Sequence, residues 1–225
     1  MPLSHKSASR SLTAKKPDIE SLLSNADSKL GRVIAAVMQK TGPLRITPSK
    51  ATPFQALVRA VIYQQLAGSA AKAIHQRLQG AIPGPLTPQK ILILTPAKMR
   101  AAGLSKSKAR YVRNLAEWFS THPKVAKSIT KMSDEKVIET LTEIAGVGVW
   151  TANVFLIFTL ARLDVVPASD YGIRRAVQLA YGLKEIATPA FVNEVAIRWR
   201  PYRSIASMYL WQSRRLKITT RDLTK

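Results

Sequence analysis

The chain contains no cysteine among its 225 residues. Disulfide bonds, cysteine-ligated zinc sites and iron–sulfur clusters are therefore excluded. Its three histidines, His5, His75 and His122, are scattered, which argues against a histidine metal site or histidine acid catalysis. No apolar run is long enough to span a membrane, and the N-terminal region lacks the apolar core of a signal peptide, so we expect neither membrane association nor secretion.

Acidic residues are also scarce. Thirteen Asp and Glu stand against 35 Lys and Arg, which gives a net charge of +22 at pH 7. This excess predicts a polyanionic partner, nucleic acid before membrane, although a generic basic surface is the alternative. Residues 1–16 carry basic residues and serines but no acid, which predicts a disordered basic tail. An organellar transit peptide has a similar composition.

The placement of apolar residues predicts an all-helical chain. Hydrophobic residues make up 46 % of the sequence, enough for a sizeable core. They recur at helical spacing over most of the chain. Several helices should begin at threonine–proline pairs, and Thr52 with Gln55 forms a capping box around Pro53. No alternating pattern of useful length indicates a strand, so the expected fold class is all-α.

The stretch most informative about function begins with Gly146 and Gly148. Two glycines one residue apart permit a tight turn and a close approach of the backbone to a ligand. The helix that follows, expected over residues 149–161, offers an anion site at its N-terminus and spans about 20 Å. Residues 162–169 can run back about 25 Å if extended, far enough to bring Asp170 beside the turn. A carboxylate near a phosphate-binding turn is expected if it serves a cation that forms on the nucleic acid.

These residues resemble the helix-hairpin-helix superfamily of DNA glycosylases, and within it 3-methyladenine DNA glycosylase II. The hairpin at residues 144–148 looks like the LPGVG turn of that family, with Ala145 where proline is usual. Asp170 occupies the position of the family's catalytic aspartate. The likeness covers about residues 52–211. Its supporting segments are residues 150–153, 167–171 and 199–204.

The resemblance implies two helical lobes, with a helix-hairpin-helix motif at a DNA-binding cleft between them. Residues 52–160 would form the lobe that contains the hairpin. Residues 17–51 and 161–225 would form the other lobe, so that residues 17–225 make one glycosylase domain.

The resemblance also implies the partner and the setting. The expected partner is double-stranded DNA containing alkylated bases, and the expected state is a monomer. We expect the protein in the cytoplasm at a bacterial nucleoid, or in the nucleus if the source is a eukaryote.

Asp170 is the catalytic candidate. An ionised carboxylate close to the sugar stabilises the positive charge that develops when an N-glycosidic bond breaks. Asp170 could instead be only the N-cap of the following helix, and Asp164 is the rival acid. Members that also cut the strand carry a lysine two residues beyond Gly148, where it forms a Schiff base. This chain has Trp150 there, which implies a monofunctional enzyme that leaves an abasic site.

Four aromatic residues are candidates for the base pocket. Trp150 and Trp211 match aromatic positions of the family, and an indole face attracts a base that carries positive charge after methylation at N3 or N7. Tyr63 and Tyr171 could also line the pocket. Packing in the hydrophobic core is the alternative for Trp150, Trp211 and Tyr63. Val154 stands where close relatives have an aromatic residue, which leaves the range of lesions open.

The remaining candidates would contact DNA along its backbone or within the duplex. The hairpin residues expected at the DNA backbone are Gly146, Val147, Gly148 and Thr151. The candidates for a side chain that fills the gap left by a flipped base are Gln65, Leu66 and Ala67. Ser105 and Lys108 match a segment that contacts the DNA backbone. The alternative for Gln65, Leu66 and Ala67 is a plain helix turn. The alternative for Ser105 and Lys108 is a solvated charged face.

No cofactor is expected to be required. In the family, backbone carbonyls of such a hairpin also hold a sodium or potassium ion, and by position these would belong to Thr142, Ile144 and Val147. Two other functions stay open: a non-catalytic helix-hairpin-helix DNA-binding protein, and a glycosylase for neutral bases such as uracil, hypoxanthine or ethenoadenine.

Overall fold

Helices are the regular secondary structure of the computed structural model, which describes residues 18–66 and 68–223. That part of the chain holds thirteen α-helices, three short 3-10 helices and no strand, so the all-α prediction is confirmed. In chain order the elements are α1 Ile19–Ala26, α2 Ser28–Thr41, α3 Pro53–Tyr63, α4 Gly68–Gly80, α5 Pro88–Leu92, α6 Pro96–Ala101, α7 Lys106–Thr121, α8 Pro123–Ser128, η1 Ile129–Lys131, α9 Asp134–Thr142, α10 Val149–Phe158, α11 Tyr171–Tyr181, α12 Pro189–Ala196, η2 Ile197–Trp199, α13 Arg203–Arg215 and η3 Thr220–Leu223. The tail predicted for residues 1–16 and the candidate Ala67 lie outside the described residues.

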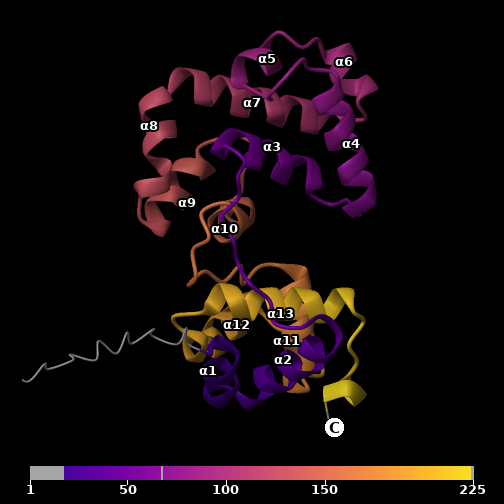
Figure 1. The fold of residues 1–225 in the computed structure, drawn as a ribbon, viewed down its shortest axis with the longest axis vertical. Coiled ribbons are helices and arrows are strands. Elements are labelled where there is room, and N and C mark those ends of the chain that lie inside the picture. Colours follow the sequence, from indigo (N-terminus) through magenta and orange to yellow (C-terminus); the bar gives the residue numbers. More distant parts are fainter. Residues whose placement is uncertain (1–17, 67, 224–225) are drawn as a thin grey trace, which may run out of the picture.

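The helices form two lobes. In Figure 1, α3 to α9 lie in the upper lobe, α1, α2 and α11 to α13 in the lower lobe, and α10 between them. Each lobe has its own hydrophobic core: one cluster takes its buried residues from between Phe54 and Val165. The other takes them from Leu23–Val37 and Ala168–Leu223. Trp211 packs against both clusters, so the two cores meet at this side chain.

Local sequence sets where many of the helices begin. Thr52 caps α3 and forms with Gln55 the reciprocal hydrogen bonds of a capping box, as predicted. The side chains of Thr87, Thr95 and Thr188 cap α5, α6 and α12 by accepting from a backbone amide, and each threonine is followed by a proline in the first turn. Fixed starts of this kind determine which face of each short helix is turned toward the core.

Helix α10 is shorter than the sequence suggested. It ends at Phe158 rather than near Ala161, because Ala161 has a positive φ of 54° and the chain turns back there. The amide of Arg162 closes this turn on the carbonyl of Leu156, at 3.0 Å. A helix of this length spans about 15 Å, so the returning segment needs less reach to bring Asp170 back to the start of α10.

A buried carboxylate ties the lower lobe together. Asp27 is 4 % exposed and caps α2, and its carboxylate accepts hydrogen bonds from the indole of Trp199 at 2.9 Å and from the hydroxyl of Tyr181. Burial by itself would raise the pKa of Asp27. The hydrogen bonds from Tyr181, Trp199 and two backbone amides outweigh burial, and the pKa lies below its ordinary value.

We therefore expect Asp27→Asn to lower the free energy of unfolding by about 1–3 kcal/mol at pH 7, because it weakens several buried hydrogen bonds. The pKa of Asp27 is lowered in the folded state, so this stabilisation is complete above the unfolded value of about 4 and is lost as pH falls through the folded pKa. Urea unfolding followed by circular dichroism at pH 7, 5 and 3 should show the difference between wild type and variant shrinking only at the lowest pH. The exposed Glu185→Gln is the control, and equal stability of Asp27→Asn and wild type at pH 7 would contradict the assignment.

Candidate active site

The hairpin that joins α9 to α10 contains two glycines in different surroundings. Gly146 has a φ of 102°, and a Cβ placed on it would overlap the ring of Tyr111. Only glycine satisfies both the backbone conformation and this contact. A Cβ on Gly148 would meet no atom within 4 Å. Gly146 is therefore required by packing, whereas Gly148 faces open space where a ligand can approach the backbone.

The start of α10 has the features of an anion site. Gly148 is the N-cap residue and provides no side chain, so no side-chain hydrogen bond within the described residues caps the first turn of α10. Gly148 and Val149 are exposed, whereas the side chain of Thr151 is buried. Open N–H groups and the positive end of the helix dipole favour an anion at this point. Val147 is buried, and its amide donates to the carbonyl of Ile144 at 2.9 Å, which closes the turn.

Asp170 lies at the N-terminus of α11, where its carboxylate accepts three hydrogen bonds. One oxygen, Oδ1, accepts from the amide of Ile173 at 2.8 Å and from the indole of Trp211 at 2.9 Å. The other oxygen, Oδ2, accepts from the indole of Trp150 at 2.6 Å. Asp170 is therefore the helix cap that the sequence allowed, and it is also held between indoles from α10 and α13. Three donors fix the direction of the carboxylate.

Gly172, which was not predicted as a site residue, makes room for this arrangement. A Cβ on Gly172 would lie 3.0 Å from Oδ1 of Asp170 and 3.4 Å from Cδ1 of Trp211. A side chain there would push the carboxylate or the indole out of position. Gly172 lies in the first turn of α11, where glycine disfavours the helix. A glycine at such a position indicates that a neighbouring group needs the space of its side chain.

The aromatic candidates differ in their relation to Asp170. The structure brings Trp150 and Trp211 to the carboxylate, and Tyr171 follows it in the chain with 70 % of its surface exposed. Phe158, which was not predicted, lies with its ring 5.6 Å from that of Trp211 and is 44 % exposed. Tyr63 packs against the core of the hairpin lobe, and the guanidinium of Arg59 lies over its ring.

The junction between α3 and α4 is an exposed turn. Gln65 has a positive φ of 55° and is exposed, and Leu66 is 38 % exposed. Both can therefore reach a partner.

The side chain of Lys108 binds the end of a neighbouring helix. Its ammonium donates to the carbonyls of Val61 at 3.2 Å, of Gln64 at 2.7 Å and of Ile62, at the C-terminal end of α3. Burial lowers its pKa. The ammonium of Lys108 is thus engaged within the protein, and its contact with the DNA backbone stays a prediction. Ser105 caps α7, its hydroxyl accepting from the amide of Lys108 at 3.3 Å.

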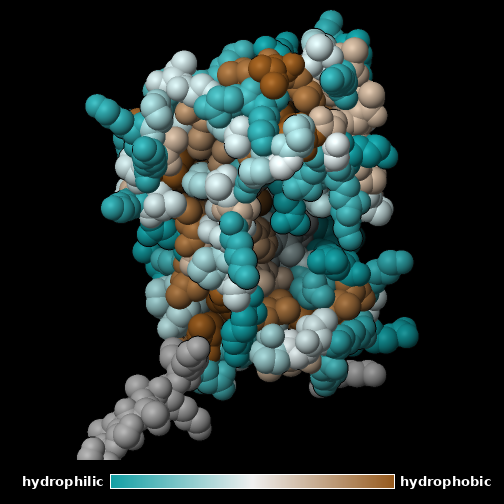
Figure 2. Space-filling model, turned by 45° about the horizontal axis from the view of Figure 1, so that its top comes forward, coloured by the Kyte–Doolittle hydropathy of each residue, from teal (hydrophilic) through white to brown (hydrophobic). Residues whose placement is uncertain are grey.

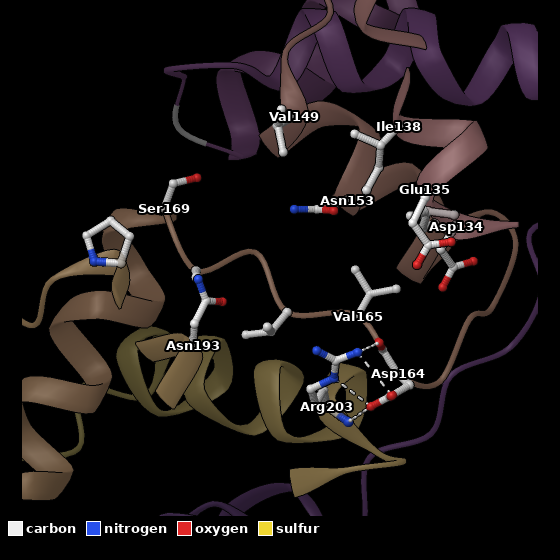
Figure 3. A pocket seen from close by; sticks show the side chains of 14 residues that line it. Asp134, Glu135, Ile138, Val149, Asn153, Asp164, Val165, Ser169, Asn193 and Arg203 are labelled. Atoms are coloured by element: carbon white, nitrogen blue, oxygen red, sulfur yellow. Dashed lines mark hydrogen bonds and ion pairs between the residues drawn. The ribbon is translucent and has the colours of Figure 1, made fainter. Parts of the chain in front are cut away.

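A cavity of about 400 Å³ lies between the lobes, close to Asp170 in the chain but not lined by it. Figure 3 shows Asp164, the rival acid, on this cavity and paired with Arg203. The guanidinium donates to both carboxylate oxygens of Asp164, at 2.7 and 3.0 Å. Asp134 and Glu135 also line the cavity. Its acidic wall disfavours a polyanion, so we place the candidate active site at Asp170 and the hairpin.

The comparisons with known proteins agree with this geometry. The chain belongs to the HhH-GPD superfamily of base excision DNA repair proteins, whose model matches residues 58–201. The resemblance noted in the sequence is thereby confirmed.

Particular relatives come from the same family. The chain is 35 % identical over 180 residues to DNA-3-methyladenine glycosylase 1 of Schizosaccharomyces pombe, covering 77 % of this chain and 78 % of the relative. It is 31 % identical over 201 residues to the alkylbase DNA glycosidase-like protein mag2 of the same yeast, covering 86 % and 91 %. The solved structure of S. pombe 3-methyladenine DNA glycosylase (Mag1) in complex with abasic DNA matches with a TM-score of 0.79 and 31 % identity, covering 88 % of this chain and 97 % of that one.

The two hairpin glycines form a matched pair for mutation. Gly146→Ala should destabilise the fold by about 1–3 kcal/mol, because the new methyl group overlaps Tyr111 and the backbone conformation disfavours alanine. Gly148→Ala should leave the melting temperature unchanged and weaken duplex DNA binding, measured by fluorescence anisotropy, because its Cβ occupies the space open to a phosphate. Wild-type affinity in a well-folded Gly148→Ala would show that DNA does not approach this turn.

Proposed function

We propose that this protein is a monofunctional alkylbase DNA glycosylase. It would release alkylated purines of the 3-methyladenine and 7-methylguanine type from double-stranded DNA and leave an abasic site. The observation that carries the proposal is the carboxylate of Asp170, held by two indoles beside an open helix N-terminus. The names of two S. pombe relatives, a 3-methyladenine glycosylase and an alkylbase glycosidase-like protein, support the same class of substrate.

Each part of this site has a task in the proposed reaction. The N–H groups at the start of α10 bind a phosphate of the damaged strand and fix the nucleotide that is flipped out of the stack. As the N-glycosidic bond lengthens, positive charge develops on the sugar, and the carboxylate of Asp170 stabilises it electrostatically. A purine methylated at N3 or N7 is already cationic, so it departs with little help from a general acid. The base takes the electrons of the broken bond and leaves as a neutral purine. Water then adds to the cationic sugar carbon and loses a proton to the solvent.

The positive charge of the methylated purine accounts for the aromatic residues at the site. Trp150 and Trp211 donate their indole N–H groups to Asp170, so their rings lie beside the place where the flipped base must arrive. An indole face attracts a cationic base by roughly 0.5–2 kcal/mol, which favours alkylated over normal purines. Trp150 also occupies the position where strand-cleaving members carry lysine. Cleavage of the strand through a Schiff base is therefore not part of the proposed reaction.

Asp170→Asn is the decisive variant. Base release from methylated duplex DNA should fall by at least 10²–10³-fold, as for other preorganised electrostatic groups. DNA binding should survive or improve, because a charge that repels phosphate is removed. Strand breaks should appear only after alkali. Asp164→Asn is the matched control and should keep its activity, since Asp164 is paired with Arg203 away from the hairpin.

Other outcomes point to other functions. Wild-type activity in Asp170→Asn would refute the assignment of the carboxylate. Salt-sensitive binding by the wild type without release of any base would favour a non-catalytic DNA-binding protein. Release of uracil, hypoxanthine or ethenoadenine without preference for methylated purines would favour a glycosylase for neutral bases.

We also propose that the protein acts as a monomer and requires no cofactor. The proposal also includes a sodium or potassium ion held by the backbone carbonyls of Thr142, Ile144 and Val147 when DNA is bound. Replacing both ions by tetramethylammonium at constant ionic strength should then lower DNA affinity several-fold without changing the melting temperature of the free protein. Constant ionic strength is needed because salt by itself weakens DNA binding steeply. Unchanged affinity in tetramethylammonium would remove the ion from the proposal.

A further inference from the structure

The side chain of Gln64 joins the two candidate DNA-contacting regions, the hairpin and the turn between α3 and α4. It is the C-cap residue of α3 and immediately precedes the exposed turn at Gln65 and Leu66. Its side-chain amide donates to the carbonyl of Gly146 at 3.1 Å and to the hydroxyl oxygen of Thr151 at 3.0 Å. An amide nitrogen has two N–H groups, and both are used. One side chain therefore binds the hairpin turn and the first turn of α10 together.

The backbone of Gln64 is fixed from another direction. Its carbonyl accepts from the ammonium of Lys108 at 2.7 Å, and the same ammonium binds the carbonyl of Val61 at 3.2 Å and that of Ile62. The last carbonyls of a helix lack partners within the helix and favour a positive charge. Tyr111, one turn further along α7, packs on Gly146. Helix α7 thus holds both the end of α3 and the hairpin.

The contacts that hold Gln64 are important because the next residue, Gln65, has a strained backbone. A residue other than glycine at a φ of 55°, as at Gln65, is unfavourable and persists where its neighbours over-determine it. Lys108 and Gln64 supply that support on the side of α3. The exposed turn is therefore held at a set distance from the phosphate-binding turn.

We propose that Gln64 is a positioning residue for base flipping, and this role rests on the proposed function. When the hairpin holds a phosphate, the junction of α3 and α4 must enter the duplex at the right depth to replace the stacking of the departed base. Gln64 sets that depth. Through Thr151, which follows Trp150 in α10, it also joins this turn to the helix that holds Asp170.

The test compares two substrates with one variant. Gln64→Met keeps the length and neutrality of the side chain but removes both N–H donors. Single-turnover release of a methylpurine, at saturating enzyme, is measured with the lesion normally paired and with the lesion opposite an abasic-site analogue. We expect about a tenfold slower release for the paired lesion and less than a twofold change for the unpaired lesion, which needs little help to leave the stack. Gln79→Met, on the exposed face of α4, is the matched control.

A double-mutant cycle tests the contact itself. Thr151→Val removes one of the two acceptors, so it should have a smaller effect than Gln64→Met. The double variant should be no slower than Gln64→Met, because the contact is already lost.

The outcomes separate a positioning role from simple destabilisation. An equal loss on both substrates, or no loss on the paired one, would overturn the proposal. If the wild type releases no base from either substrate, the proposed function fails instead. The role of Gln64 is then judged by 2-aminopurine fluorescence in bound DNA, which should rise less with Gln64→Met than with wild type. Equal fluorescence would overturn it.

Discussion

The site depends on three hydrogen bonds that hold one carboxylate in place. A negative charge beside a phosphate-binding turn is repelled by the phosphates it must approach. At Asp170 the N–H groups of Trp150, Trp211 and Ile173 offset that repulsion and keep the carboxylate in one orientation. The two indoles come from α10 and α13, so the carboxylate also joins the two lobes. Any change in how the lobes pack therefore changes the direction of the catalytic candidate.

The hairpin is also held in one conformation, but by packing and neutral hydrogen bonds, because residues 144–148 carry no charge. Its function would come from backbone groups, and backbone groups must be placed by packing. Gly146 is pressed against Tyr111, and the carbonyl of Ala145 accepts from the amide of Asn114 at 3.2 Å. Ala145 stands where the family usually has proline, which would stiffen the turn. Here Asn114 and Gln64 hold the carbonyls of the turn from outside. The departure from the family pattern is thus matched by side-chain support.

The sequence was informative where function depends on spacing along the chain. Two glycines, an apolar helix and an aspartate at a fixed distance were enough to place Asp170 beside the hairpin. Helix starts were also accessible, because caps such as Thr52 act within a few residues. Contacts between distant segments were not accessible. Nothing local shows that Trp211 donates to a carboxylate 41 residues away.

Lys108 shows what sequence alone leaves open. In sequence it matches a family segment that contacts the DNA backbone. In space its ammonium lies on the carbonyl end of α3, where three acceptors are left free by the end of the helix. The sequence shows the charge, whereas only the folded structure shows that carbonyls of the same chain bind the ammonium. A helix end is a binding site for a cation whichever molecule supplies it, and here α7 of the same chain does.

The distribution of the few acids gives the approach of DNA a direction. Basic residues dominate the chain, and hydrophilic side chains cover most of the face seen in Figure 2. Three of the 13 acids, Asp134, Glu135 and Asp164, line the cavity between the lobes. Asp134 is paired with Arg162 and Asp164 with Arg203, which reduces the negative potential of the cavity wall. The hairpin side has the opposite character, with the exposed residues Gly148 and Val149 at a helix N-terminus. Val149 and Ser169 also line the cavity, so its acidic wall lies on one side of the candidate site, and a polyanion is favoured on the side of the hairpin.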